Sequence, residues 1–222
     1  MKGIFVKYIV FIILLFMLVS CSNSLIVKPL EKDKSALNVN LGGPILKVHK
    51  VNLPLPLLSF NYAYGVDSNL TFVNNFYLTS AFFGVFHNDI GILYNVSNQK
   101  DFLPGISILP HLAFMTNFNL PDTRLFPSLY INSYWFYNDF LFYTGTNIIY
   151  EGAKRKAFNQ KITNRFLLSP HLGMTYFTKN YNYTLEFKYL LPNISNENIV
   201  VDYNSFSNYG AVGIYFSFGI NL

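Results

Sequence analysis

The chain has 222 residues, with 16 lysines and arginines against 11 aspartates and glutamates, which gives a formal net charge of +5. Charged residues make up only 12% of the chain and aromatic residues 18%, whereas ordinary soluble proteins contain about 25% charged residues. The weak positive charge argues against a nucleic-acid-binding protein. The scarcity of charge also leaves too few charged side chains to cover the surface of a soluble domain.

The first twenty residues have the features of a secretory signal. Lys2 and Lys7 precede an uninterrupted apolar stretch from Tyr8 to Val19. A positive segment, a short apolar segment and small residues at the cleavage point are typical of a signal peptide. The alternative is an uncleaved anchor helix, but a spanning helix needs about 20 apolar residues and this stretch is shorter.

The only cysteine of the chain, Cys21, follows directly in the run Leu18-Val19-Ser20-Cys21. This run resembles the lipobox of bacterial lipoproteins. The resemblance implies cleavage between Ser20 and Cys21, lipid such as palmitate on the Cys21 thiol, and, with Ser22 next, sorting to the outer membrane of a diderm bacterium. A lipidated Cys21 would leave no thiol for a disulfide or a zinc site.

Residues 21–35 are interpreted as a lipidated tether, because they contain Pro29 and a cluster of mixed charge and show no sustained periodicity. Residues 36–222 form the second part of the mature chain, and strand patterns dominate them. The domain organisation is therefore a signal peptide over 1–20, a tether over 21–35 and a β-domain over 36–222.

Ten candidate strands follow, and the last is the clearest. From Ala211 onward apolar residues alternate with small or polar ones, as expected for side chains on opposite faces of a strand. Tyr181–Leu191 repeats the pattern. Weaker alternation predicts strands over Leu37–Leu41, Leu58–Tyr64, Leu70–Thr79, Val85–Val96, Leu103–Thr116, Leu125–Phe136, Phe140–Tyr150 and Phe166–Thr178.

These strands predict an all-β fold, an antiparallel up-and-down barrel of about eight to ten strands that spans a membrane. After residue 20 no apolar run is long enough for a spanning helix, and in lipid only helices and closed barrels pair every backbone group. The alternative is a soluble, lipocalin-like barrel with its apolar face inward. The few lysines and glutamates on the polar faces favour the membrane barrel.

Loop lengths support this prediction. The connections Glu151–Arg165 and Pro192–Asn208 are long, whereas Asn138–Asp139 and Lys179–Asn180 are tight. Alternation of short periplasmic turns with long external loops is typical of outer-membrane barrels. With an even number of strands, this pattern places the N-terminus, and its lipid, on the periplasmic side.

A local motif points the same way. The segment Tyr64-Gly65-Val66-Asp67-Ser68-Asn69-Leu70 resembles the Tyr-Gly-x-x-x-Asn-Leu turn that is common in outer-membrane β-barrel proteins. The segment Asp89-Ile90-Gly91-Ile92-Leu93-Tyr94 continues the resemblance. The family resemblance implies the same membrane-embedded barrel.

A short repeat suggests a polar cluster in the lumen. Pro110-His111-Leu112 and Pro170-His171-Leu172 share three residues, and alternation turns both histidines inward. The inward-facing candidates are His87, Asp89, His111, His171, Glu186 and Lys188. Histidines with a carboxylate can bind a metal or transfer protons. Polar residues in a barrel also satisfy one another, and we expect three distant histidines not to converge, so we assign no catalytic, cofactor or metal site.

A basic loop contains Lys154, Arg155 and Lys156, followed by Lys161 and Arg165. On the external side it would meet lipopolysaccharide phosphates, to which arginine and lysine bind well; the alternative is a solvated hairpin loop. The partners we expect are outer-membrane lipids, including lipopolysaccharide, and no nucleic acid.

The sequence therefore predicts an outer-membrane lipoprotein barrel with a structural or interaction role, no cofactor and no enzymatic activity. Two alternatives stay open. One is a small-ligand-binding barrel or narrow channel, and the other is a membrane-embedded enzyme acting on lipids with serine, histidine and a carboxylate.

Overall fold

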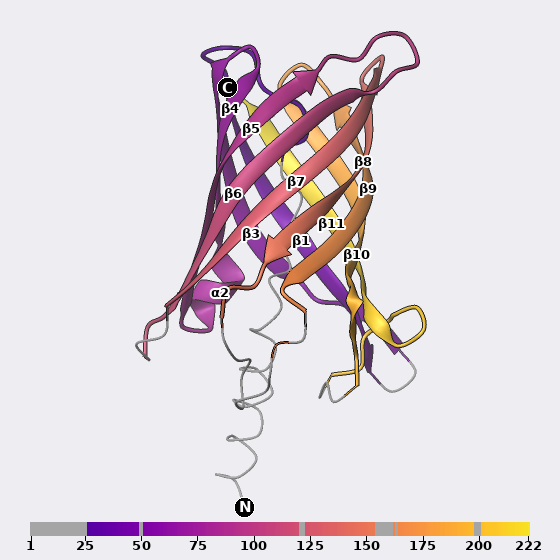
Figure 1. The fold of residues 1–222 in the computed structure, drawn as a ribbon. Helices are drawn as coiled ribbons and strands as arrows, with labels where there is room; N and C mark the ends of the chain where they lie inside the picture. The colour runs from indigo at the N-terminus through magenta and orange to yellow at the C-terminus, as the bar shows by residue number, and fades with distance from the viewer. Residues whose placement is uncertain (1–25, 49–50, 120–122, 154–161, 163, 198–200) are drawn as a thin grey trace, which may run out of the picture.

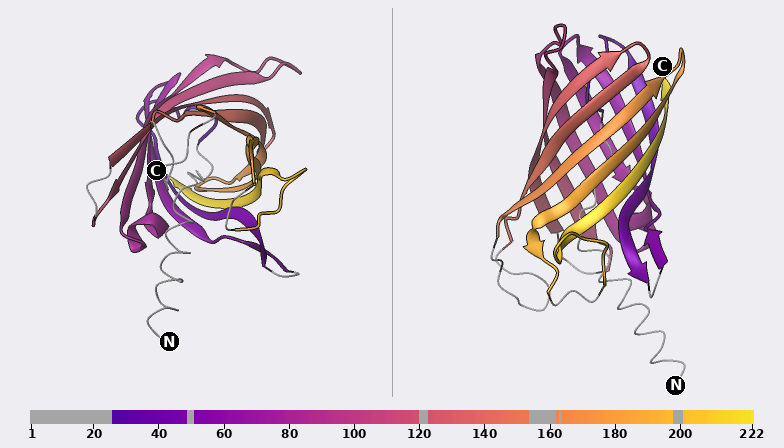
Figure 2. Two further views of the ribbon diagram at one scale, coloured as in Figure 1. Left: turned by 60° about the horizontal axis from the view of Figure 1, so that its bottom comes forward. Right: turned by 90° about the vertical axis from the view of Figure 1, so that its right-hand side faces the viewer.

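The computed structural model describes residues 26–48, 51–119, 123–153, 162, 164–197 and 201–222. They form a barrel of tilted antiparallel strands (Figures 1 and 2). Its strands are β1 (Ser35–Val48), β2 (Val51–Pro54), β3 (Leu57–Asp67), β4 (Leu70–Tyr77), β5 (Val85–Ser97), β6 (Gly105–Asn117), β7 (Thr123–Tyr137), β8 (Phe140–Tyr150), β9 (Phe166–Phe177), β10 (Tyr181–Ser195) and β11 (Tyr209–Asn221).

The barrel is closed by pairing of its first and last strands. From β3 to β11 each strand pairs with the next one in the chain, and β1 pairs with both β3 and β11. The closing ladder runs from Ala36 opposite Asn221 to Pro44 opposite Gly213. The result is an all-β antiparallel barrel of ten long strands, which confirms the predicted fold class. Closure matters because it leaves no long open edge.

The two ends of the barrel differ. At one end, called the turn end here, tight turns at Asp67–Leu70, Tyr137–Phe140 and Phe177–Tyr181 lie with the start of β1 and the end of β11. The other end, the loop end, carries the longer connections and the short helix α2 (Leu78–Phe82). In Figure 1 the turn end is at the top, beside the C-terminus, and α2 lies at the bottom.

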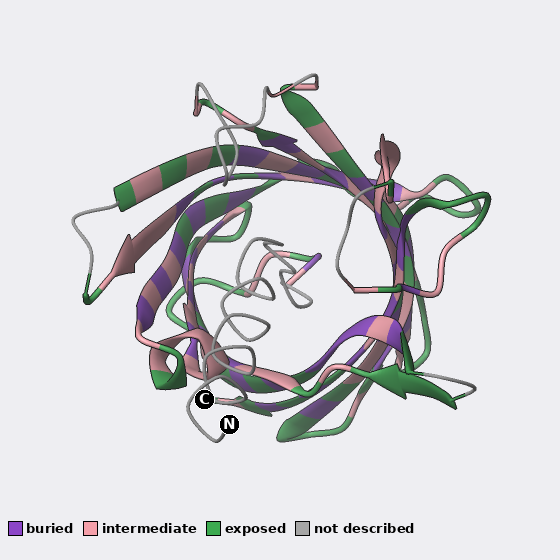
Figure 3. Ribbon diagram, turned by 90° about the horizontal axis from the view of Figure 1, so that it is seen from below, coloured by how far each residue is buried: buried purple, intermediate pink, exposed green. Residues whose placement is uncertain are grey.

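The two faces of the barrel wall have opposite chemistry, and buried and exposed residues alternate along each strand (Figure 3). The outward side chains are large and apolar or aromatic; examples are Leu37, Phe60, Ile90, Ile92, Leu112, Phe142, Leu172, Phe187, Phe216 and Phe218. The buried inward side chains are mostly polar; examples are Asn38, Ser59, Asn61, Thr71, Asn75, Ser107, Asn132, Asn147, Ser169, Thr175 and Ser217. This arrangement is the reverse of a soluble barrel with an apolar interior.

The ten predicted strands correspond to the ten long strands. Most ends move by a few residues, but β1 extends seven residues beyond the predicted end at Leu41, to Val48. Two elements were not predicted. Helix α2 begins where the strand over Leu70–Thr79 was expected to end. Strand β2 pairs only with the part of β1 that extends beyond the barrel, from Ile45 to Val48. The prolines near β2 obscure any alternation in the sequence.

Within the described ranges no helix is both long and apolar enough to cross a membrane.

Candidate functional site in the lumen

The centre of the lumen is occupied by one tyrosine between two histidines. Tyr130 of β7 stacks on His111 of β6, with ring centroids 5.2 Å apart. On its other side it meets His171 of β9 edge-on, with centroids 5.7 Å apart. The histidines of the two Pro-His-Leu repeats therefore converge on one ring, contrary to our expectation, while His87 belongs to a separate group.

Each of these histidines lies opposite a glycine on the preceding strand. Gly91 pairs with His111, and Gly145 pairs with His171. A Cβ atom at Gly91 would lie 2.6 Å from the His111 Cβ, and one at Gly145 would lie 2.9 Å from the His171 Nε2. The two glycines thus provide the space in which the imidazole rings turn into the lumen.

A buried ion pair completes the centre. Glu186 and Lys188 lie two residues apart on β10 and share its inward face. Lys188 Nζ is 3.0 Å from Glu186 Oε1, and both side chains are almost fully buried. The Tyr143 hydroxyl donates to the second Glu186 oxygen at 2.8 Å. Lys188 also reaches across the lumen to the Tyr130 hydroxyl at 3.4 Å.

A second polar group lies on β4 and β5. His87 Nε2 is 3.2 Å from Asp89 Oδ1, and the Tyr77 hydroxyl donates to Asp89 Oδ2 at 2.7 Å. The Tyr77 and His87 rings stack with centroids 3.7 Å apart. Burial of a carboxylate is tolerated here because it has both an ionisable partner and a hydroxyl donor.

All six of the predicted polar residues therefore lie buried in the lumen. Sequence reasoning missed the tyrosines that connect them, namely Tyr77, Tyr130 and Tyr143. Inward alternation was the one signal that could have identified these tyrosines, since each occupies an inward strand position. In the described part of the chain no three histidine, cysteine or acidic side chains come together to hold a metal ion.

The turn end of the lumen is filled in a different way. A segment that we call the strap, Ile26–Lys34, precedes β1 and lies inside the ring of strands (Figure 3). The Ser107 hydroxyl donates to the Val27 carbonyl at 2.6 Å. The Leu30 amide donates to Thr71 Oγ1 at 2.8 Å. At its end, the Asp33 amide donates to the Gly65 carbonyl, and the Gly65 amide donates to the Lys34 carbonyl, each at 2.8 Å.

These anchors hold the strap against one side of the barrel. Its bonds go to β3, β4 and β6, and the side chains of Ile26 and Leu30 pack on a cluster from β3 to β7, made of Ala63, Val73, Leu93, Leu109 and Tyr130. Val27 packs with Tyr134, Leu141 and Tyr143 of β7 and β8. Gly65 is required at the contact, since a Cβ there would overlap the Glu31 carbonyl.

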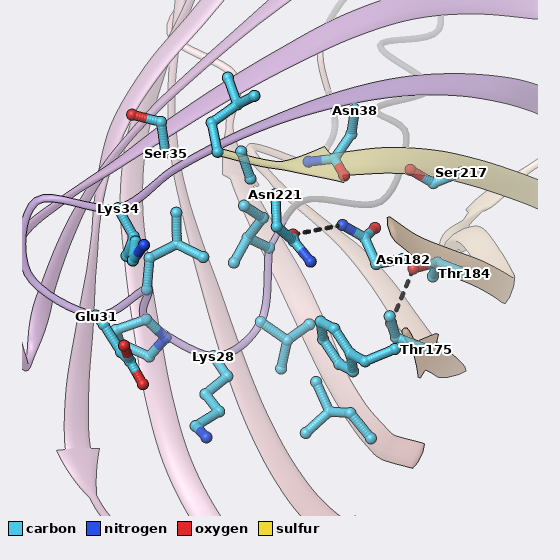
Figure 4. Close-up of a pocket in the computed structure, with 18 of the residues that line it drawn as sticks. Lys28, Glu31, Lys34, Ser35, Asn38, Thr175, Asn182, Thr184, Ser217 and Asn221 are labelled. Atoms are coloured by element: carbon cyan, nitrogen blue, oxygen red, sulfur yellow. Dashed lines mark hydrogen bonds between the residues drawn. The ribbon is translucent and has the colours of Figure 1, made fainter. Parts of the chain in front are cut away.

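On the opposite side the strap leaves a cavity of about 530 Å³ (Figure 4). The barrel wall of this cavity is polar and comes from the neighbouring strands β1, β11, β10 and β9: Asn38, Ser217, Asn221, Asn182, Thr184 and Thr175. The strap contributes Lys28, Glu31 and Lys34, and the rim contributes Lys179. None of these residues was predicted from the sequence as a site residue.

Some sequence-based assignments lie outside the described residues. They are the cleavage and lipidation residues Ser20 and Cys21, and the loop residues Lys154, Arg155, Lys156 and Lys161. The lipidated tether over 21–35 stays a prediction, although its described part is the strap.

No protein-family model matches the chain, and no curated protein matches it in sequence. Among solved structures, the NanC porin covers 84% of this chain and 100% of its own at 10% identity, with a TM-score of 0.46. The outer membrane protein OprG from Pseudomonas aeruginosa covers 86% and 97% at 11% identity, with a TM-score of 0.36. Ail, the attachment invasion locus protein of Yersinia pestis, covers 86% and 99% at 8% identity, with a TM-score of 0.29. At such identities the likeness concerns the barrel fold alone.

Proposed function

We propose that this chain is an outer-membrane β-barrel with a structural or interaction role, anchored in addition by lipid on Cys21, and that it has no catalytic activity. The observation that carries the proposal is the reversed chemistry of the closed wall, with apolar side chains outside and polar ones inside. An apolar exterior of this kind is stable in hydrocarbon. A closed barrel also pairs the backbone N–H and C=O groups of every strand there.

A filled lumen favours this role over a wide pore. Lys188 of β10 contacts Tyr130 of β7 across the interior, and the strap occupies the turn end. Small barrels whose interior is packed with side chains leave no aqueous channel. In planar bilayers we expect no stable conductance from the purified full chain; steady single-channel steps would support the narrow channel instead.

The membrane location is tested by two matched substitutions. Leu112 lies at the middle of β6 and faces outward, whereas Phe102 is exposed beside the turn end. Leu112→Arg is expected to destabilise the barrel in lipid by about 2–4 kcal/mol, and Phe102→Arg by about 0–1 kcal/mol. Urea unfolding in vesicles measures both, and equal tolerance of the two arginines would contradict a membrane-embedded wall.

The lipid anchor is tested separately. For the Cys21→Ala variant we expect the protein to stay in the membrane fraction and to keep a heat-dependent shift on a gel, because the barrel itself is held by lipid. Loss of labelling by a palmitate analogue in this variant would support lipidation at Cys21. Release into the soluble fraction without a heat shift would mean a soluble domain held only by its lipid.

An interaction role is most simply assigned to the loop end. Where the connection after β10 joins β11, the Tyr189 hydroxyl donates to the carbonyls of Phe206 and Tyr209 at 3.1 and 2.7 Å. Phe206 itself is two-thirds exposed. A variant with this connection shortened, whose barrel keeps its heat-dependent gel shift, is expected to lose its function in cells. Full function of such a variant would exclude this surface as the interaction site.

A further inference from the structure

The cavity beside the strap has two chemically different sides. Its barrel side carries a row of amides and hydroxyls beside some apolar side chains. In this row Asn182 donates to Asn221 at 3.0 Å, and Thr175 and Thr184 are hydrogen-bonded at 2.8 Å. Figure 4 shows this row facing the strap across the cavity. An asparagine amide has two donors and an acceptor with two lone pairs, so these side-to-side bonds leave hydrogen-bonding capacity on the wall.

The charged lining is predominantly positive. Lys28, Lys34 and Lys179 line the cavity, and among the described residues Glu31 is the single acidic side chain in its lining. Lys28 is held in place by the Phe136 ring, whose centroid is 4.9 Å from the Lys28 Nζ. Phe136 and Phe177 add an aromatic edge, with ring centroids 5.8 Å apart. Ammonium groups beside neutral amides and hydroxyls suit an anion that also carries hydroxyl groups.

The cavity exists because the strap is anchored on one side only. Its hydrogen bonds go to Gly65, Thr71 and Ser107, on β3, β4 and β6. The opposite wall, from β9 through β11 to β1, is left facing the cavity. On this wall Gly219 leaves room for the side chains of Asn38 and Asn182, which occupy the place that a Cβ would take. The volume of about 530 Å³ lies within the range of small-molecule sites, about 300–1,000 Å³.

We propose that this cavity is a binding site for a small polyhydroxylated organic anion, such as a sugar phosphate or a sugar acid. The ligand enters from the turn end, because Lys179 and Asn180 of the β9–β10 turn line the cavity at that rim. Its anionic group lies beside the lysines, and its hydroxyl groups lie along the amide and hydroxyl row. The strap is then one wall of the site as well as an internal filling of the barrel.

The experiment measures binding to the full chain in detergent micelles by titration calorimetry. The probes are glucose 6-phosphate and gluconate, with glucose and inorganic phosphate as the neutral and the hydroxyl-free comparisons. We expect saturable binding of at least one sugar anion and weaker binding of both comparisons. A preference between the two sugar anions identifies the anionic group as phosphate or carboxylate. The proposal would be overturned if neither sugar anion binds. It would also be overturned if glucose or inorganic phosphate binds as tightly as the sugar anions.

Matched variants separate this site from general attraction to a basic surface. Lys34→Gln and Lys179→Gln are each expected to weaken binding about tenfold, since one charge-assisted hydrogen bond is lost. Lys100→Gln removes the same charge from the β5–β6 turn, at the same end of the barrel but outside the cavity lining. An equal loss of binding affinity in all three variants would contradict a specific site.

A third substitution tests the neutral wall. Thr184→Val keeps the volume of the side chain and removes a hydroxyl from the row, and we expect it to weaken binding of the sugar anion but not of inorganic phosphate. A heat-dependent gel shift in each variant shows that its barrel is intact. Because binding is measured in micelles, failure here leaves the proposed membrane role untouched, and failure of the membrane tests leaves the binding result untouched.

Discussion

The middle of the lumen is filled by side chains of the strands, whereas its turn end is filled only in part, by the strap, which leaves a cavity beside it. In the middle, side chains of the barrel strands meet across the interior, as Lys188, Glu186 and Tyr143 do. At the turn end, the backbone of the strap is inserted and held by a few hydrogen bonds to Gly65, Thr71 and Ser107. Contacts between strands are part of barrel formation itself, whereas we expect the strap to open locally while the barrel stays closed.

The comparison therefore predicts two kinds of response. Substitutions in the middle are expected to lower the stability of the whole barrel. Substitutions at the strap are expected to act locally, with a smaller change in global stability and a larger change in accessibility. Local opening of weakly held segments below the global unfolding free energy is a general property of folded proteins.

The largest effect is expected from Glu186→Gln. The change keeps the size of the side chain but leaves the buried Lys188 without its negative partner, and breaking a buried pair in this way costs about 3–5 kcal/mol. Urea unfolding in vesicles measures the loss. In the double variant Glu186→Gln/Lys188→Met most of the lost stability should return. If Glu186→Gln alone is as stable as the parent, the ion pair does not hold the middle of the lumen together.

A smaller global effect and a clear local one are expected from Gly65→Val. The new side chain would overlap the Glu31 carbonyl, so the strap must move, at a cost of about 1–3 kcal/mol. Trypsin cleavage after Lys32 and Lys34 should become faster while the heat-dependent gel shift persists. Gly152→Ala is the control, since its nearest neighbour would be Tyr150 Cε1 at 3.7 Å. Unchanged cleavage would refute the idea that the strap is a separable filling.

The smallest effect is expected from Ser107→Ala. It removes the hydroxyl that donates to the Val27 carbonyl at 2.6 Å, which costs about 1 kcal/mol for one neutral hydrogen bond. Four further hydrogen bonds hold the strap, one of them from the Tyr64 hydroxyl to Asp33, so we expect only a modest rise in trypsin cleavage. Ser133→Ala on the outward face of β7 serves as the comparison. If Ser107→Ala lowered the global stability as much as Glu186→Gln does, the strap and the middle of the lumen would not differ in the predicted way.

The strands were predictable because the membrane barrel imposes one rule on every strand. Apolar and polar positions alternate with a period of two, and in β11 this pattern is complete from Ala211 to the end of the strand. The same rule predicted that His111 and His171 turn inward. The helix α2 was missed because it continues an apolar strand for only one turn and carries no capping side chain.

The sequence by itself determined the alternation and the inward direction of the six polar residues, because these depend on neighbours within a strand. Only the tertiary structure decided that His111 and His171 share the Tyr130 ring and that the segment before β1 enters the lumen. The bond from Ser107 to Val27 joins residues 80 positions apart, and the bond from Leu30 to Thr71 joins residues 41 apart. Such contacts follow from closure of the barrel, which brings distant strands to face one another, and no local pattern in the chain encodes them.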